Sequence, residues 1–146
     1  RIRRISSKKK SESFMGSDLT YEDMTNRKLE DYSYNVIGSE IISNKNCYLL
    51  EQIPKISKTN YSKHISWITK DDFLPIKENS FDKNRTLIKE KIFTYQKIEN
   101  YHILNSILVK NYINNHTTHL KFYNIIVNSN IKDDFFHEKN LKRLPK

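Results

Sequence analysis

The chain has 146 residues, of which 36% are hydrophobic and 29% are charged, a balance that alone would allow disorder. Nine Tyr, seven Phe and one Trp are too many aromatic residues for a chain that buries nothing, so we expect one folded domain over 1–146. Two Gly exclude a glycine-rich nucleotide loop, and the single Cys47 excludes a disulfide framework. The net charge of +9 comes from a Lys excess without a recognition motif, so no nucleic-acid partner is expected.

The first residues indicate a strand that is already under way. Ile2 and Ile5 stand among arginines, and no Met or apolar signal segment precedes them. We therefore expect this chain to be the C-terminal part of a longer, N-terminally truncated domain. A solvated loop follows, and Thr20 with Asp23 three positions later predicts one short helical turn near 20–25.

From there the pattern is a series of strands separated by Asn, Asp and Pro turn signals. The absence of Ala and the 19 Ile favour strands over helices. We expect strands at Tyr32–Ile42, Cys47–Ile53, Tyr61–Thr69, Leu74–Phe81, Thr86–Ile98, Tyr101–Ile113 and Thr117–Val127. Their short connections predict a mainly β fold, an antiparallel meander that forms a strongly curved open sheet, or unclosed half-barrel, with one or two short helices.

Two features are expected near the C-terminal end. In the last strand Leu120 and Phe122 set one register and Ile125 and Val127 the opposite one, which predicts a β-bulge near Tyr123 or Asn124. The change of period from Lys132 to Leu144 predicts a short helix that begins at Asp133–Asp134.

Residues that could carry catalysis or bind a metal are few. His116 and His119 would lie on opposite faces of a strand, which disfavours a metal pair. Asp18 and Asp23 are interpreted as residues of a capped, exposed turn that accept backbone N–H bonds and tolerate substitution. Cys47 is interpreted as a small hydrophobic residue. The sequence therefore predicts no catalytic residue, no metal site and no cofactor, and the protein is not expected to be an enzyme.

An apolar face offers a different kind of site. Alternation places Tyr61, Ile65 and Trp67 on one face of their strand, opposite His64, and Phe93 and Tyr95 can face the same way. A curved sheet lined with such residues suits an acyl chain, whose burial contributes about 0.8 kcal/mol per CH₂. Trp67 has two interpretations, core filler or cavity wall, and the sequence leaves both open.

Six segments in order resemble the outer-membrane lipoprotein-sorting, or LolA-like, family of periplasmic carriers. The segment F-M-G-S-D-L-T-Y-E-D-M resembles the family's "lfGsDfsyeDm" stretch, although in the turn F-D-K-N the family's Gly is replaced by Asn84. The six segments are Phe14–Met24, Cys47–Lys55, Tyr61–Lys77, Phe81–Asn84, His116–Phe122 and Ile131–Leu141.

The resemblance implies an unclosed antiparallel barrel with a hydrophobic cavity, and a non-enzymatic periplasmic carrier or binder of lipoprotein acyl chains or lipid. It implies an inner-membrane exporter as a partner, and it places Met15 and Met24 near the cavity beside the five candidates above. The alternatives are an envelope sensor or exporter-accessory protein on the same fold, a basic module that binds nucleic acid or a membrane surface, and a hydrolase that uses Asp18 and Asp23.

Overall fold

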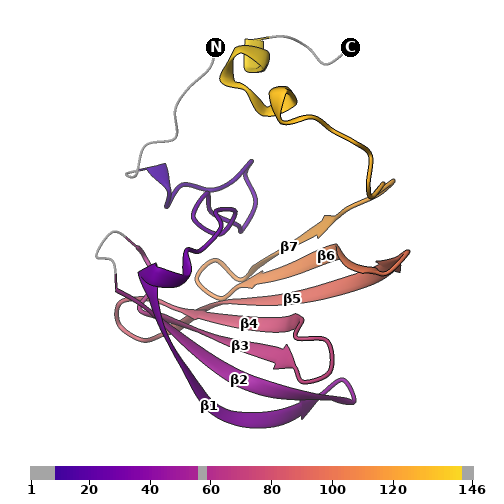
Figure 1. The fold of residues 1–146 in the computed structure, drawn as a ribbon. Coiled ribbons are helices and arrows are strands. Elements are labelled where there is room, and N and C mark those ends of the chain that lie inside the picture. The colour runs from indigo at the N-terminus through magenta and orange to yellow at the C-terminus, as the bar shows by residue number, and fades with distance from the viewer. Residues whose placement is uncertain (1–8, 56–58, 143–146) are drawn as a thin grey trace.

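The computed structural model describes residues 9–55 and 59–142 and shows one seven-stranded sheet (Figure 1). Each strand pairs antiparallel with the next one in the chain, and β1 and β7 are the two edges. The strands are β1 (Tyr32–Ile42), β2 (Lys45–Pro54), β3 (Lys63–Thr69), β4 (Pro75–Phe81), β5 (Leu87–Ile98), β6 (Tyr101–Asn111) and β7 (His116–Lys121). This confirms the expected antiparallel meander and its open, curved form.

Short turns with left-handed backbone connect the long strands. Ile42 pairs with Lys45 across the two-residue turn Ser43–Asn44, whose φ angles are 50° and 59°. Such turns match the right-handed twist of the flanking strands, and Asn tolerates this conformation better than most residues. Pairing shifts register at four places in the sheet, between Val36 and Gly38 and in three later pairs, and such irregularities increase the local bend.

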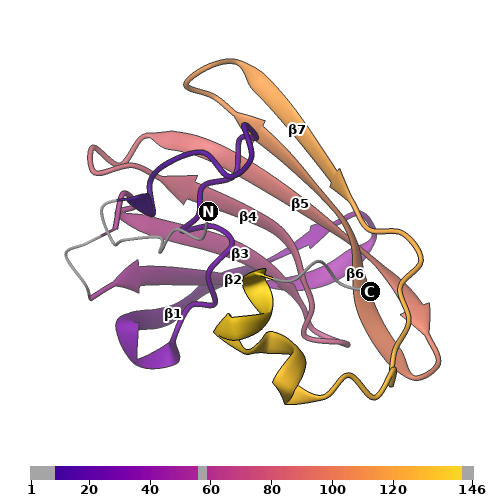
Figure 2. The same ribbon diagram turned by 90° about the horizontal axis from the view of Figure 1, so that it is seen from above.

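The two faces of the sheet carry separate hydrophobic clusters. On the inner face, which we define by this contact, Leu19 of the N-terminal segment packs against Ile107 and Val109. The outer face carries a cluster of Cys47, Trp67 and Ile76. Figure 2 shows that the N-terminal segment, residues 9–31, crosses one face of the sheet, and that the C-terminal turns lie on the same side.

Of the two expectations for the end of the chain, the one for the β-bulge was wrong and the one for the short helix was confirmed in its position. β7 ends at Lys121, and the expected bulge near Tyr123 or Asn124 is replaced by the end of the strand. The backbone of Asn124 is left-handed, with a φ of 53°, which a continuing strand does not allow. The short helix begins at Asp133 as expected, but it is a 3₁₀ helix, η3 (Asp133–Phe136), followed by a second one, η4 (Glu138–Lys142), and no side chain among the described residues caps η3.

The N-terminal expectations had mixed outcomes. Thr20 and Asp23 form the expected reciprocal capping contacts, but only a turn follows, and the short 3₁₀ helix η2 (Leu29–Asp31) comes later. Tyr61 was wrongly placed on the face of Ile65 and Trp67, because β3 begins only at Lys63 and alternation does not extend back to it. The strand end expected at Ile2–Ile5 lies outside the described residues.

Candidate functional site

The inner face is built of three rows of side chains that run across the strands. Cross-strand partners share a face, so the pairing register defines each row. The first row is polar: Tyr34, Gln52, His64, Ser80, Lys89, Asn111 and His116. The second is mixed: Val36, Leu50, Ser66, Glu78, Lys91, Val109 and Thr118. The third is apolar: Tyr48, Ile68 and Pro75 on one half of the sheet, Phe93, Ile107 and Leu120 on the other.

Asp23 attaches the N-terminal segment to the first two rows. Its carboxylate lies 2.8 Å from the Lys89 ammonium and 2.5 Å from that of Lys91, and it has no exposed surface. The Tyr61 hydroxyl donates to it at 3.0 Å, and the Thr20 backbone N–H donates at 2.8 Å. Burial alone would raise the pKa of Asp23, but the charges of Lys91 and Lys89 outweigh burial and hold the pKa far below its usual value.

Arg27 makes the second attachment, to Glu78. Two guanidinium nitrogens donate to the two carboxylate oxygens at 2.6 and 2.8 Å, the bidentate arrangement that arginine favours. Lys91 lies 3.2 Å from the same carboxylate, so the two attachments form one network. Although burial opposes it, Lys91 and Arg27 together lower the pKa of Glu78 well below its usual range.

His64 lies under this network in its neutral form. Its Nδ1 is 2.8 Å from the Ser80 hydroxyl and 3.5 Å from Arg27, and its Nε2 has no hydrogen-bond partner among the described residues. Burial lowers the pKa of His64 to about 3, and the neighbouring Arg27 contributes in the same direction. A histidine that stays neutral beside an arginine avoids two like charges in a buried site.

Asp18 makes the third attachment, at the β7 edge. Its carboxylate accepts hydrogen bonds from Thr118 at 2.6 Å and Asn111 at 3.1 Å, and it lies 2.7 Å from Nδ1 of His116. Burial is the largest single influence and raises the pKa of Asp18, but these side-chain contacts together lower it.

The expectation of an exposed acidic turn is therefore wrong for both aspartates. Asp18 and Asp23 bind side chains of distant strands, and both are held ionised by their partners. A general acid needs a carboxyl group whose pKa is raised, so this pair does not suit the acid chemistry of a hydrolase. Both aspartates instead fix the N-terminal segment to the sheet.

The third row keeps apolar surface that the N-terminal segment does not cover. Val36 in the second row is 57% exposed, and its partner Leu50 and the neighbouring Ile68 are only half-buried. We call Val36, Tyr48, Leu50 and Ile68 the inner patch. Beyond it, the Tyr95 hydroxyl donates to the Pro75 carbonyl at 2.9 Å and links the two halves of the apolar row.

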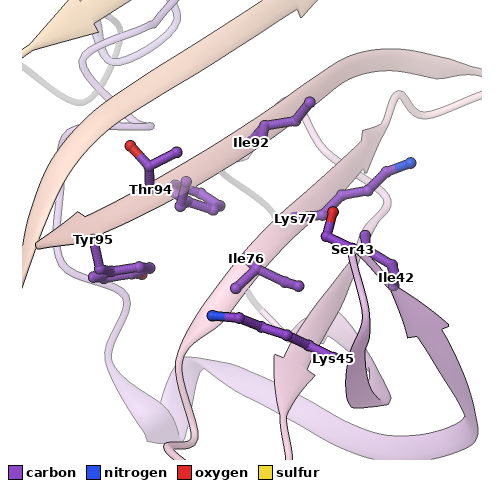
Figure 3. A pocket seen from close by; sticks show the side chains of 9 residues that line it. Ile42, Ser43, Lys45, Ile76, Lys77, Ile92, Thr94 and Tyr95 are labelled. Atoms are coloured by element: carbon purple, nitrogen blue, oxygen red, sulfur yellow. The ribbon is translucent and has the colours of Figure 1, made fainter.

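A separate groove lies between the β1–β2 turn and strands β4 and β5 (Figure 3). Its volume is about 430 Å³. By register, Lys77 and Ile92 lie on the outer face, opposite the N-terminal segment, and Tyr95, Ile76 and Lys45 point toward one another across the groove. The lining residues are Ile42, Ser43, Lys45, Ile76, Lys77, Ile92, Phe93, Thr94 and Tyr95.

The structure divides the seven lipid-facing candidates among four places. Phe93 and Tyr95 line the groove. Ile65 and Trp67 belong to the outer cluster, which also contains Ile76 from the lining of the groove. Tyr61 is buried in the charged network. The two remaining candidates, Met15 and Met24, lie exposed on the N-terminal segment, Met15 at 84%.

The inner patch was missed because its residues look ordinary in the sequence. Val36, Tyr48, Leu50 and Ile68 lie on three strands and become neighbours only through register. A usable signal was the placement of charges such as Lys89 and Lys91 at alternate positions inside a strand, which marks a polar part of a face. Across the described ranges, no group of three His, Cys, Asp or Glu could hold a metal ion, and no helix is long and apolar enough to span a bilayer.

Comparison with known proteins shows what the chain is similar to. A family model described as an uncharacterized protein matches residues 1–143. A search of curated proteins found no match. An outer membrane lipoprotein-sorting protein domain from Vibrio parahaemolyticus is 29% identical with a TM-score of 0.92, over 98% of this chain and 62% of its own.

Two further solved structures share the fold. A DUF1329 family protein from Desulfovibrio piger is 31% identical with a TM-score of 0.90, over 96% of this chain and 60% of its own. A LolA superfamily protein from Nitrosomonas europaea is 16% identical with a TM-score of 0.72, over 89% of this chain and 60% of its own, which shows the fold alone. The chain thus spans about 60% of the length of the structures it matches.

Proposed function

We propose that this chain belongs to the LolA-like family of outer-membrane lipoprotein-sorting proteins, whose fold it shares, and that it binds the acyl chains of lipoproteins, or a similar lipid, on its inner face. The protein would act as a carrier without catalysis, in the periplasm, and an inner-membrane exporter would deliver its cargo. The proposal treats residues 1–146 as one domain.

One observation carries the proposal: the inner patch is apolar and open while the rest of the inner face is occupied. The N-terminal segment satisfies the polar groups of the first two rows through Asp18, Asp23 and Arg27. Val36 and Tyr48, by contrast, remain exposed on the same face. Each CH₂ of a chain buried there would contribute about 0.8 kcal/mol, so an acyl chain with about ten buried CH₂ groups would contribute about 8 kcal/mol toward the cost of association.

The test compares two exposed β-branched residues on opposite faces of the β1–β2 hairpin. Val36 lies on the inner face and is 57% exposed, and Ile53 lies on the outer face and is 43% exposed. Val36→Glu and Ile53→Glu each add one charge at similar exposure. The whole protein and each variant are incubated with a triacylated lipopeptide, passed through a detergent-free gel-filtration column, and analysed for bound lipopeptide by mass spectrometry.

We expect Val36→Glu to lose most of the bound lipopeptide and Ile53→Glu to retain it, because only the first change places a charge against the acyl chains. Circular dichroism checks that both variants are folded. Equal retention by the two variants, or no binding by the unmodified protein, would refute the proposal.

A further inference from the structure

The groove lies where the two central strands are shorter than the strands beside them: β3 and β4 have seven residues each, whereas β2 has ten and β5 has twelve. β3 ends at Thr69, which pairs with Cys47, so the turn that carries Ile42 and Lys45 extends past the end of β3. On the other side of the gap, β4 begins only at Pro75, and β5 continues past Ile92, the partner of Lys77. The gap is therefore bounded by two strand pairs and has a volume of about 430 Å³, within the range of small-molecule sites.

The floor of the groove is apolar and fixed in place. Ile76 is 9% exposed and belongs to the same buried cluster as Cys47 and Trp67, against which Ile42 also packs. Ile92 and Tyr95 complete the apolar wall from β5. A pre-formed apolar wall binds a hydrocarbon chain without an ordering cost for the protein.

The two lysines of the groove differ in what they contact. The Lys77 ammonium lies 2.8 Å from Glu90 and 4.8 Å from the centre of the Trp67 ring, so it is already paired. The exposed Lys45 makes no ion pair with any carboxylate within the described residues, and its ammonium points toward Tyr95 and Ile76 (Figure 3). The groove thus combines an apolar wall with one uncompensated positive charge.

We propose that this groove binds a single acyl chain that carries an anionic head group, with the head at the Lys45 ammonium and the chain against Ile42, Ile76 and Ile92. A neutral head would leave the lysine without a partner, and a chainless anion would leave the apolar wall in water. Ile42, Lys45 and Ile92 lie on the outer face, opposite the inner patch, whereas Phe93 and Tyr95 come from the inner face. The variant Val36→Glu therefore tests whether this site is separate from the carrier site proposed above. The head could be the carboxylate of a fatty acid or the phosphate of a lysolipid.

The experiment measures binding of three ten-carbon probes to the whole protein by titration calorimetry. Decanoate and decyl phosphate represent the two sources of the anionic head, and decanol has none. The indole of Trp67 adjoins the groove through Ile76, so a change in its emission on titration, absent in Trp67→Phe, reports where the probe binds.

We expect Lys45→Gln to weaken decanoate or decyl phosphate about fivefold and to leave decanol unchanged, because it removes only the charge. Ile92→Ser should weaken all three probes about tenfold or more. The matched control for Lys45→Gln is Lys97→Gln. Lys97 is an exposed lysine of β5 outside the groove, so this change should leave the affinity for all three probes unchanged. Tighter binding of decanoate than of decyl phosphate identifies a fatty acid, and the reverse identifies a phosphate head.

Two further variants keep the result interpretable. Ile42→Ser replaces Ile92→Ser if that variant is unfolded by circular dichroism. Val36→Glu should leave decanoate binding intact, which separates this site from the inner patch. The proposal is overturned if neither anion binds below millimolar concentration, if Lys45→Gln has the same affinity for both as the unmodified protein, or if Val36→Glu abolishes their binding.

Discussion

Replacing Asp23 with asparagine removes one negative charge from the centre of the inner network and leaves its shape almost unchanged. The carboxylate has no exposed surface, and its partners Lys89 and Lys91 expose only 7% and 4% of their side chains. Lys91 would retain Glu78 at 3.2 Å, whereas Lys89 would retain, among the described residues, only the Tyr61 hydroxyl at 3.0 Å. The substitution therefore leaves at least one buried ammonium without a counter-charge.

Removing one partner of a buried ion pair costs about 3–5 kcal/mol, mainly because the other charge remains buried and unpaired. We expect Asp23→Asn to lower the free energy of unfolding by that amount, which is a large part of the stability of an ordinary domain. Urea unfolding of the whole protein, followed by circular dichroism, measures the loss as a shift of the midpoint at constant slope.

The matched control is Asp72→Asn, which makes the same change at an exposed position and should alter stability by less than about 0.5 kcal/mol. A loss below about 1 kcal/mol for Asp23→Asn would refute the reasoning. That result would mean that the lysines find water or other partners, and that the N-terminal segment is not held by charge.

Three other changes test neighbouring parts of the structure by the same unfolding assay. Arg27→Lys keeps the charge but loses the bidentate contact with Glu78, so we expect a loss of about 1.5–3 kcal/mol; no loss would show that charge alone suffices. Burial lowers the pKa of His64 to about 3, so between pH 6.5 and about 4 the unfolded chain binds a proton that the folded chain does not. Stability should then fall with falling pH by up to about 1.4 kcal/mol per unit, and His64→Gln should flatten that slope; an unchanged slope would contradict the assignment. Trp67→Ala should cost about 3–5 kcal/mol as a core residue, whereas a small loss would favour the cavity-wall interpretation.

The sheet could be predicted from the sequence because its signals are local. Alternation within a strand and Asn-rich turns between strands involve neighbours in the chain, and the bounds of β1 were predicted to the residue. The prediction of a continued strand after Lys121 was wrong for the same reason, because it too relied on local signals. Ile125 and Val127 read as a change of register, although the left-handed backbone of Asn124 and Asn128 ends the strand instead.

The inner face could not be predicted in this way, because its partners are distant in the chain. Asp23 and Lys91 are 68 positions apart, and no local period relates them. The covering element is an irregular segment without a hydrophobic period, so nothing marks which face it covers. In the sequence, Lys89 and Lys91 count toward an excess of lysine that would be expected on the surface, yet both are buried in ion pairs.

Polarity decreases across the inner face from the first row to the third. The polar rows stabilise the fold, and the apolar row keeps surface that is free to bind a ligand. Polar groups in the first two rows must keep their partners, because an unpaired buried charge costs several kcal/mol, so the N-terminal segment is confined to one position. Tyr48 and Ile68 in the apolar row offer only side-chain carbon surface, apart from the Tyr48 hydroxyl, and no hydrogen bond must break when water there is exchanged for a hydrocarbon chain. Under the proposed function, an acyl chain would enter and leave this row without disturbing the ion pairs of Asp23 and Arg27, which is the reversible loading that a carrier requires.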